Sequence, residues 1–388
     1  MVQSVNSIPI LDLAQQYAAI AAEMNEAVLD VLASGNYIGG SRVLGFEQQF
    51  ATYIGVSDCV ACNSGTDALY LALRALGIGS GDEVITVPFT FFATAEVVSA
   101  VGAKPVFVDI DAQTFNLDLA QLASAITDKT KAIIPVHLFG QAVDMTALMA
   151  IAQSHQLAVI EDCAQSTGAL WAGKKVGSIG HIGCFSFYPT KNLGACGDGG
   201  AITTNDPAIA AKIRILRVHG EKSRYHHEEI GINSRLDAIQ AAMLQIKLRY
   251  LDTWNEQRRT LAARYTQYLS HVPSVVTPQE LLESRGVWNQ YTIRLPVHEN
   301  ASIDTNDGSY RDKMRQKLQE RGVGSMVYYP RPLHLQPVYQ NLGYQAGQFP
   351  VSEQACHEVL SLPLFPELTI EQQDQVIYTL KDCLSEKE

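Results

Sequence analysis

The feature that most constrains the fold is a regular alternation, between about Asp82 and Thr204, of short apolar runs with segments of helical periodicity. This pattern is typical of βα units, in which a mostly parallel sheet is buried between helices. The candidate strands are Val84–Val87, Pro105–Val108, Ala132–Val136, Val159–Glu161, Cys184–Phe187 and Ala201–Thr204. The chain is therefore predicted to have an α/β fold.

Helices are expected on both sides of this region. In Gln15–Ser34 apolar residues recur at helical spacing, and Gly35 ends the run. A long helix is expected to begin near Ser234, because Ser234 and Asp237 have capping-box spacing before an apolar face. A further amphipathic segment covers Leu251–Leu269.

The pattern changes after residue 269. Trp288–Leu295 and Val323–Tyr329 are predicted strands, Tyr310–Arg321 is a predicted helix, and the polar stretch Ser302–Ser309 is typical of a surface loop. This succession predicts a second, smaller α+β domain. We expect an N-terminal segment and helix in residues 1–35, a large domain in residues 36–251 and a small domain in residues 252–388.

Composition narrows the possible functions. The net charge of −11 argues against a nucleic-acid partner, which would require clustered cations. No window of about eighteen apolar residues predicts a membrane span, and Met1–Asn6 does not resemble a secretory signal, so a cytoplasmic protein is expected. The seven cysteines are scattered, as reduced buried thiols would be. Cys59 and Cys62 have C-x-x-C spacing, but no second pair completes a metal site, and a buried strand is the preferred interpretation.

The first segment with possible chemistry is Ser64-Gly65-Thr66, which precedes a helical pattern. Free backbone N–H groups at a helix start, together with the Thr66 hydroxyl, can hold a phosphate. An ordinary helix cap explains the same residues.

A second segment ends a buried strand with Asp162, followed by Gln165. Open α/β sheets bind ligands at this edge. A carboxylate there can pair with the protonated ring nitrogen of pyridoxal phosphate (PLP), and Gln165 could hydrogen-bond the phenolic oxygen. The alternative is an acid that caps the following helix.

The third segment places Lys191 just after the strand that contains Ser186, and a glycine-rich stretch, Gly194–Gly200, follows. A desolvated lysine has a lowered pKa and can react as a neutral amine. Ser186 could bind a phosphate. Most lysines in loops are simply solvated, and that remains the alternative.

Asn233 lies in the fourth segment, immediately before the expected start of the long helix. This helix start offers a second anion site, unless it is only a cap.

These four segments resemble those of the DegT/DnrJ/EryC1/StrS aminotransferase family, whose members are PLP enzymes of fold type I that act on nucleotide-linked keto sugars. The resemblance extends nearly from end to end, through Ser34–Ile38, Pro88–Thr94 and Leu362–Pro366. It implies a mixed, mostly parallel seven-stranded sheet between helices, with a smaller C-terminal α+β domain.

The resemblance also implies roles for individual residues. Gly65, Thr66 and Ser186 would hold the cofactor phosphate, Phe89 would stack on the ring, Asp162 would meet the ring nitrogen, Gln165 would meet the phenolic oxygen, and Lys191 would bind the cofactor covalently. Asn233 would reach the phosphate in a neighbouring subunit. A homodimer with shared active sites is therefore expected, with no metal in the site.

The same resemblance suggests the substrates. Glutamate would donate the amino group to a nucleotide-linked keto sugar. His226 and His227 resemble the members that aminate C3 more than those that aminate C4, although an exposed histidine-rich loop would look similar. Tyr188, Tyr328, Arg331 and His334 are candidate contacts to the sugar or pyrophosphate, or else surface packing residues.

Other functions remain possible on the sequence alone: C4 amination, amination of a cyclitol, or a non-catalytic PLP-binding regulator. Relatives that replace the lysine by histidine catalyse dehydration or deoxygenation, but this chain keeps Lys191. The nucleotide, TDP or UDP, is not predicted.

Overall fold

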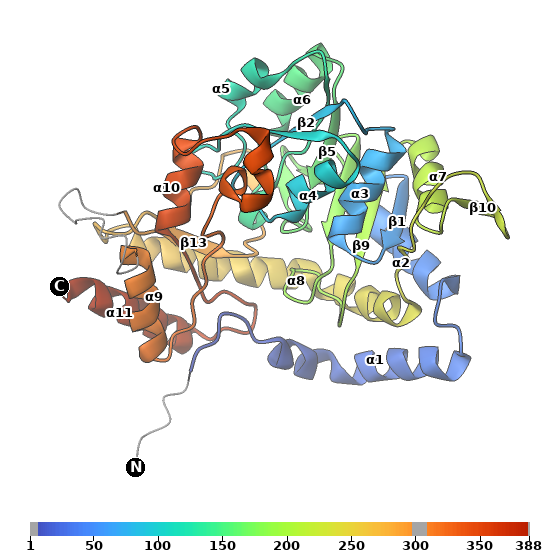
Figure 1. Cartoon of the computed structure of the whole chain (residues 1–388). Coiled ribbons are helices and arrows are strands. Elements are labelled where there is room, and N and C mark those ends of the chain that lie inside the picture. Colours follow the sequence, from blue (N-terminus) through green and yellow to red (C-terminus); the bar gives the residue numbers. More distant parts are fainter. Residues whose placement is uncertain (1–6, 297–308, 387–388) are drawn as a thin grey trace.

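The computed structural model describes residues 7–296 and 309–386 and is built around a seven-stranded sheet (Figure 1). The strand order is β1-β9-β8-β5-β4-β2-β3. Strand bounds are β1 Asp58–Cys62, β2 Glu83–Thr86, β3 Lys104–Phe107, β4 Thr130–Ile133, β5 Ala158–Asp162, β8 Ile182–Ser186 and β9 Gly200–Thr204. Only β9 runs antiparallel to its neighbours within this sheet.

All six predicted strands are present, with shifted ends, and the sheet is mixed and mostly parallel, so the α/β prediction is confirmed. The C-x-x-C segment is also a strand, β1, in which Cys59 and Cys62 are both buried.

Helices cover both faces of the sheet, which explains why its strands are nearly continuous apolar runs. One face packs against α3 (Gly65–Ala75), α4 (Ala93–Ala100) and α7 (Pro207–Leu216). The other packs against α2 (Gly40–Ile54), α6 (Met145–Ser154) and the first part of α8 (Ala238–Leu269). Neighbouring residues of one strand, such as Val84 and Ile85, belong to opposite apolar clusters, as the period of two in a strand requires.

The predicted N-terminal helix is α1 (Leu13–Ser34), which ends at Gly35 with φ of 68°. The predicted start of the long helix near Ser234 is wrong. α8 begins at Ala238, because Asp237 is still extended and the buried Ser234 hydroxyl hydrogen-bonds Asn63 Oδ1 at 3.3 Å. The two predicted segments form one 32-residue helix, since no proline or glycine interrupts residues 238–269.

The C-terminal part has its own apolar cluster, which includes the last part of α8. Its strands are β13 (Tyr291–Arg294) and β14 (Val359–Leu362), an antiparallel pair, and its helices are α9 (Tyr310–Glu320), α10 (Pro350–Glu358) and α11 (Ile370–Ser385). The boundary expected at residue 252 falls within α8, and the division into domains stays a prediction. Ser309 caps α9, and the rest of the expected loop, residues 302–308, lies outside the described residues.

The strand predicted at Val323–Tyr329 is wrong. Val323 forms a single bridge to Ile8, and Met326 forms one to Ser361, so two different partners replace a continuous ladder. The strand predicted at Trp288–Leu295 is present but shorter. The remaining short elements are β6 Leu170–Trp171, β7 Lys174–Lys175, β10 Glu221–Ser223, β11 His226–His227, β12 Ser284–Arg285 and α5 Leu119–Leu122, with 3₁₀ turns at Ala123–Ala125, Leu138–Gly140, Leu333–Leu335 and Pro337–Leu342.

Within the described part of the chain, the helices are each too short or too polar to cross a membrane.

Candidate active site

A pocket of about 610 Å³ lies where the parallel strands end. Asp162 ends β5, Ser186 ends β8, and Gly199 lies just before β9, whose opposite direction brings its start to the same edge. Eight of the predicted site residues line this pocket: Gly65, Thr66, Asp162, Gln165, Ser186, Tyr188, Lys191 and Tyr328. The sheet therefore brings together segments that are far apart in the sequence.

The start of α3 forms one end of the pocket. The Ser64 hydroxyl caps this helix by accepting a hydrogen bond from Asp67 N at 3.1 Å. Gly65 is packed so tightly that a Cβ there would lie 2.6 Å from Ser186 Cβ. A helix start with free backbone N–H groups, next to the hydroxyls of Thr66 and Ser186, has the donors that an anion requires.

Asp162 is a buried carboxyl group on the pocket wall. Its Oδ2 accepts a hydrogen bond from the Thr94 hydroxyl at 2.9 Å, and Oδ1 accepts one from Ala164 N at 3.1 Å. Burial raises the pKa of Asp162, although both hydrogen bonds and nearby Lys191 lower it. A cationic ligand atom beside this carboxyl group would stabilise its charged form.

Lys191 lines the same pocket, on a tight loop after β8. Its backbone N–H donates to Tyr188 O at 2.8 Å, and a Cβ at Gly194 would lie 2.3 Å from Pro189 O. Burial lowers the pKa of Lys191 to about 8, although Asp162 opposes this shift. The neutral, reactive form of the amine is therefore much more populated near neutral pH than in a solvated lysine.

Gln165 is held in one orientation. Its Oε1 accepts a hydrogen bond from Phe139 N at 2.7 Å, and its Nε2 donates to the Tyr329 hydroxyl at 3.0 Å. Burial raises the pKa of Tyr329, so this phenol stays protonated. The second N–H of the Gln165 amide can still serve a ligand.

Four predicted residues lie outside the pocket lining. Phe89 is fully buried behind the wall, with its ring edge-on to Tyr329 at 6.1 Å between centroids. Asn233 and Arg331 are exposed on the surface. The side chain of His334 is buried and bonded to Glu353 at 3.1 Å. The roles predicted for these residues stay predictions.

The structure adds pocket residues that the sequence did not single out, above all Thr94, Tyr329 and Gln290. Thr94 belongs to the segment Pro88–Thr94, and Thr90 and Thr94 are two buried threonines one helical turn apart, with hydroxyl oxygens 3.2 Å from each other. Such a pair among apolar residues could have served as a signal. Tyr329 and Gln290 come from the C-terminal part, and local pattern gives no sign of their position.

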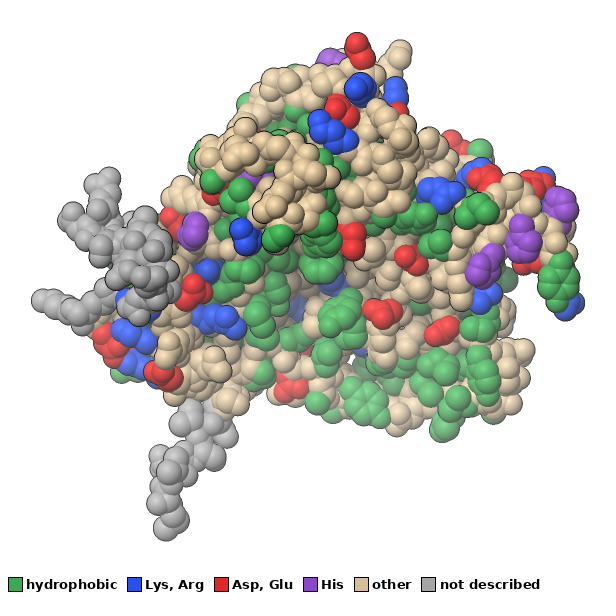
Figure 2. Space-filling view, in the orientation of Figure 1, with side chains coloured by type: hydrophobic (Ala, Val, Ile, Leu, Met, Phe, Trp, Pro, Cys, Tyr) green, Lys and Arg blue, Asp and Glu red, His purple; other side chains and the backbone are tan. Residues whose placement is uncertain are grey.

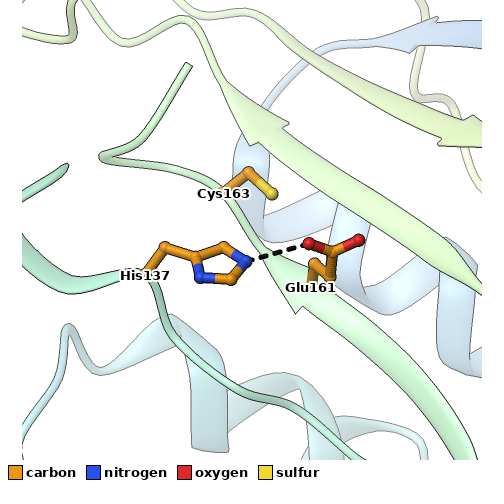
Figure 3. Close-up of side chains that lie close together, drawn as sticks. All are labelled: His137, Glu161 and Cys163. Atoms are coloured by element: carbon orange, nitrogen blue, oxygen red, sulfur yellow. Dashed lines mark hydrogen bonds and ion pairs between the residues drawn. The ribbon is translucent and has the colours of Figure 1, made fainter. Parts of the chain in front are cut away.

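His137, Glu161 and Cys163 lie close together at the end of β5 (Figure 3), and Glu161 and Cys163 are the sequence neighbours of Asp162. Glu161 is 3.0 Å from His137 Nε2 and accepts backbone hydrogen bonds from Gly177, Ile179 and Gly180. The donors within the fold therefore satisfy this buried carboxylate, and it fastens residues 177–180 to the end of β5.

The fold and the site together define the class of protein. A reactive lysine and a buried carboxylate face one pocket, at the end of a mixed sheet and beside an anion-binding helix start. This is the arrangement of a fold type I PLP-dependent enzyme, in which the protein binds and orients the cofactor that carries the chemistry.

Comparison with known proteins gives the family. Residues 18–381 match the DegT/DnrJ/EryC1/StrS aminotransferase family, and the chain belongs to it. It is therefore a PLP-dependent aminotransferase, as the sequence predicts.

Several relatives match along almost the whole chain. The chain is 50% identical over 373 residues to a "pleiotropic regulatory protein" of Geobacillus stearothermophilus, with 96% of this chain and 97% of the relative covered. It is 44% identical over 379 residues to a UDP-N-acetyl-3-dehydro-alpha-D-glucosamine 3-aminotransferase of Acidithiobacillus ferrooxidans, with coverage of 97% and 98%. It is also 42% identical over 375 residues to a dTDP-3-amino-3,4,6-trideoxy-alpha-D-glucose transaminase of Streptomyces venezuelae, with coverage of 97% and 96%.

Solved structures agree with this relationship. DesV of S. venezuelae, in complex with a ketimine intermediate, has a TM-score of 0.93 at 41% identity, with 98% of this chain and 100% of that chain covered. NtdA of Bacillus subtilis with bound cofactor PMP has a TM-score of 0.89 at 32% identity, with coverage of 99% and 87%.

Proposed function

We propose that the protein transfers an amino group from glutamate to the C3 keto carbon of a nucleotide-linked keto sugar. The observation that carries the proposal is that Lys191 and Asp162 face one pocket at the edge of the sheet. Two of the relatives described above carry names that place the amino group at C3: one is named for a dTDP-linked 3-amino sugar, and the other for 3-amination of a UDP-linked 3-dehydro sugar. These names support C3 over C4 and leave the nucleotide open.

The residues present fit the phosphate and ring of PLP. The phosphate would be bound by Gly65, Thr66 and Ser186. Because Gly65 has no side chain, its backbone can lie close to Ser186, and the donors of both residues can reach one phosphate. Asp162 is buried and accepts hydrogen bonds from two neutral donors, the Thr94 hydroxyl at 2.9 Å and Ala164 N at 3.1 Å. Its carboxylate would pair with the protonated, cationic ring nitrogen. The free N–H of Gln165 would donate to the phenolic oxygen. Stacking by Phe89 stays a prediction.

When bound, PLP supplies an electron-poor ring that stabilises negative charge on carbon. Asp162 would keep the ring nitrogen protonated, and Thr94 would hold the carboxylate in place. Nζ of Lys191 would remove a proton from the amino-acid carbon as a general base and return a proton as an acid. The lowered pKa of Lys191, about 8, suits both directions of this transfer.

The substrate contacts are the least constrained part of the proposal. Tyr188 and Tyr328 line the pocket and would contact the sugar or pyrophosphate. Arg331 is exposed, and His334 would have to leave its contact with Glu353 in order to reach a ligand. Among these four residues we therefore give most weight to the two tyrosines.

A homodimer completes the proposed site. Apolar side chains gather over α1 at the lower right of Figure 2, and Leu29, Leu32, Tyr37, Ile38 and Leu44 are between 47% and 63% exposed. A large exposed apolar surface of this kind is typical of an interface. Asn233, exposed and outside its own pocket, would then reach the phosphate site of the partner subunit.

The location proposed for this reaction is the cytoplasm. All seven cysteines are free, and six of them are buried, as expected in a reducing compartment.

A non-catalytic regulator is the second candidate, because the relative with 50% identity is named a regulatory protein. Adding glutamate to the PLP-loaded protein separates the two functions. An enzyme converts the cofactor to its amino form, with loss of the visible absorption band and release of a keto acid, whereas a passive binder leaves the cofactor unchanged.

The acceptor is tested by incubating the glutamate-treated protein with 3-keto and 4-keto nucleotide sugars, each as its TDP and UDP form, and detecting the amino product by mass. We expect product from a 3-keto sugar. Product from the 4-keto sugars alone would overturn the C3 assignment.

A further inference from the structure

Asn289 bonds the residues on both sides of the reactive lysine, through the backbone of Thr190 and the side chain of Asn192. Its Nδ2 donates to Thr190 O at 3.3 Å and to Asn192 Oδ1 at 2.8 Å, so one amide contacts the residue before Lys191 and the residue after it. Asn289 is 6% exposed and comes from the segment just before β13. A part of the chain almost a hundred residues away in sequence therefore fixes the lysine loop.

The contact continues through two more buried asparagines. Asn192 Nδ2 donates to Asn255 Oδ1 at 2.7 Å and to Val287 O at 3.0 Å. Asn255, on α8, donates from Nδ2 to Thr167 O at 3.1 Å. Asn192 and Asn255 are 4% and 6% exposed. The three amides form a chain that joins the lysine loop, α8 and the turn after β5.

Backbone carbonyl groups fix the direction of this chain. Thr190 O, Val287 O and Thr167 O can only accept hydrogen bonds, so each neighbouring asparagine must present its NH₂ group to them. Oδ1 of Asn192 then accepts from Asn289, and Oδ1 of Asn255 accepts from Asn192, so donation runs in one direction from Asn289 to Thr167. Aligned hydrogen bonds inside a protein polarise and strengthen one another.

Neither Asn289 nor Asn255 lines the pocket that contains Lys191. Their hydrogen bonds to Thr190 and Asn192 connect these two residues to the lysine loop. Other bonds that fix the loop are those from Lys191 N to Tyr188 O at 2.8 Å, from Ala195 N to Phe187 O at 2.7 Å and from Lys247 Nζ to Gly194 O at 2.8 Å. These bonds do not involve the Thr190 carbonyl or the Asn192 side chain, which are the two groups that Asn289 holds.

We propose that Asn289, Asn192 and Asn255 form a positioning clamp for Lys191. The clamp directs Nζ of Lys191 toward the amino-acid carbon from which it removes a proton. The proposal rests on the proposed transaminase function. The clamp acts on proton transfer and on the titration of the lysine, and it leaves binding of the phosphate and ring to other residues.

The test uses full-length protein loaded with PLP and two variants of the clamp. Asn289→Ala removes both bonds to the lysine loop, and Asn255→Asp keeps the acceptor for Asn192 but loses the donor to Thr167. We expect Asn289→Ala to slow the single-turnover reaction with glutamate by about tenfold or more, because small displacements of a reacting group are costly. Asn255→Asp should show a smaller loss. The affinity for PLP and the KM for the sugar should stay within about threefold.

The pH dependence of the covalent bond between Lys191 and PLP distinguishes a positioning role from a purely structural one. The bond is monitored by its visible absorption. The clamp predicts a shifted midpoint in Asn289→Ala. The control is Gln373→Ala, which removes a fully buried amide on α11 that donates to Leu261 O at 2.7 Å and accepts from Arg264 at 3.1 Å. It should lower thermal stability and leave both the rate and the midpoint unchanged.

Two results would overturn the clamp: wild-type rate and midpoint in a folded Asn289→Ala protein, or an equal loss in Gln373→Ala. If the wild-type protein does not react with glutamate, the proposed donor is wrong. The titration of the Lys191–PLP bond still decides the clamp in that case, because it requires no substrate.

Discussion

Gly65 and Ser186 are packed so closely that a single added methyl group would lie 2.6 Å from Ser186 Cβ. The contact joins the start of α3 to the end of β8, and both residues line the proposed phosphate site. We expect Gly65→Ala to weaken PLP binding by about tenfold or more, the cost of one or two lost hydrogen bonds. Equilibrium dialysis of apoprotein with PLP measures this.

The matched control for that substitution is Gly79→Ala. A Cβ at Gly79 would lie 3.4 Å from Val101 O, an ordinary contact outside the pocket. Its PLP affinity should equal that of the wild type. If Gly65→Ala binds PLP with wild-type affinity, the phosphate site is not at the start of α3.

Asp162→Asn tests the partner of the ring nitrogen. The variant is isosteric, and its amide oxygen can accept from Ala164 N while its NH₂ group donates to the Thr94 hydroxyl, but it has no negative charge. Loss of a preorganised charge at the reacting centre typically costs on the order of 100-fold in rate. We expect such a loss in single turnovers with glutamate, with PLP occupancy nearly unchanged. A wild-type rate would refute the role of Asp162.

Thr94→Val tests a residue that only the structure identified. The substitution keeps the shape of the side chain and removes the 2.9 Å hydrogen bond to Asp162 Oδ2. Because one neutral-to-charged hydrogen bond is worth about 1.5–3 kcal/mol, the rate should fall roughly ten- to 100-fold. If the steady-state kcat of Thr94→Val matches that of the wild type, Thr94 does not hold Asp162 for catalysis.

The pH dependence follows from Lys191. Its pKa is lowered to about 8 by burial, and only the neutral amine attacks PLP. The rate of covalent PLP binding to the apoprotein should therefore rise with pH and level off above a midpoint near 8. Since Asp162 raises the pKa of Lys191, Asp162→Asn should move the midpoint to lower pH. Stopped-flow absorbance measures both, and a midpoint near that of a solvated lysine would contradict the burial of the amine.

The sequence predicts the sheet well because its strands are buried on both faces and therefore appear as uninterrupted apolar runs. The start of α8 was misplaced because Ser234 has the residue type of a cap, yet its hydroxyl serves Asn63 instead. Val323–Tyr329 has the apolar content of a strand, but its partners Ile8 and Ser361 each offer only one bridge. Whether such a segment pairs as a strand depends on residues that are distant in the sequence, and the local sequence pattern carries no information about them.

The site shows the same division. Asp162, Ser186 and Lys191 could be predicted because each follows a recognisable strand, and strand ends meet at one edge of the sheet. Tyr329, which bonds Gln165 in the pocket, and Asn289, which bonds the lysine loop from outside it, could not be predicted, because packing of the C-terminal part against the sheet places them. Asn233 is expected to act in the partner subunit, and a single chain gives no distance for that contact.

The most direct test of the central claim compares the wild type with Lys191→Ala in the complete reaction of glutamate with a 3-keto nucleotide sugar, using mass detection of the amino product. The account predicts product from the wild type, and borohydride reduction should fix PLP to Lys191. It predicts neither product nor covalent PLP from Lys191→Ala, although that variant should remain a folded dimer. Turnover and covalent PLP in folded Lys191→Ala would contradict the account.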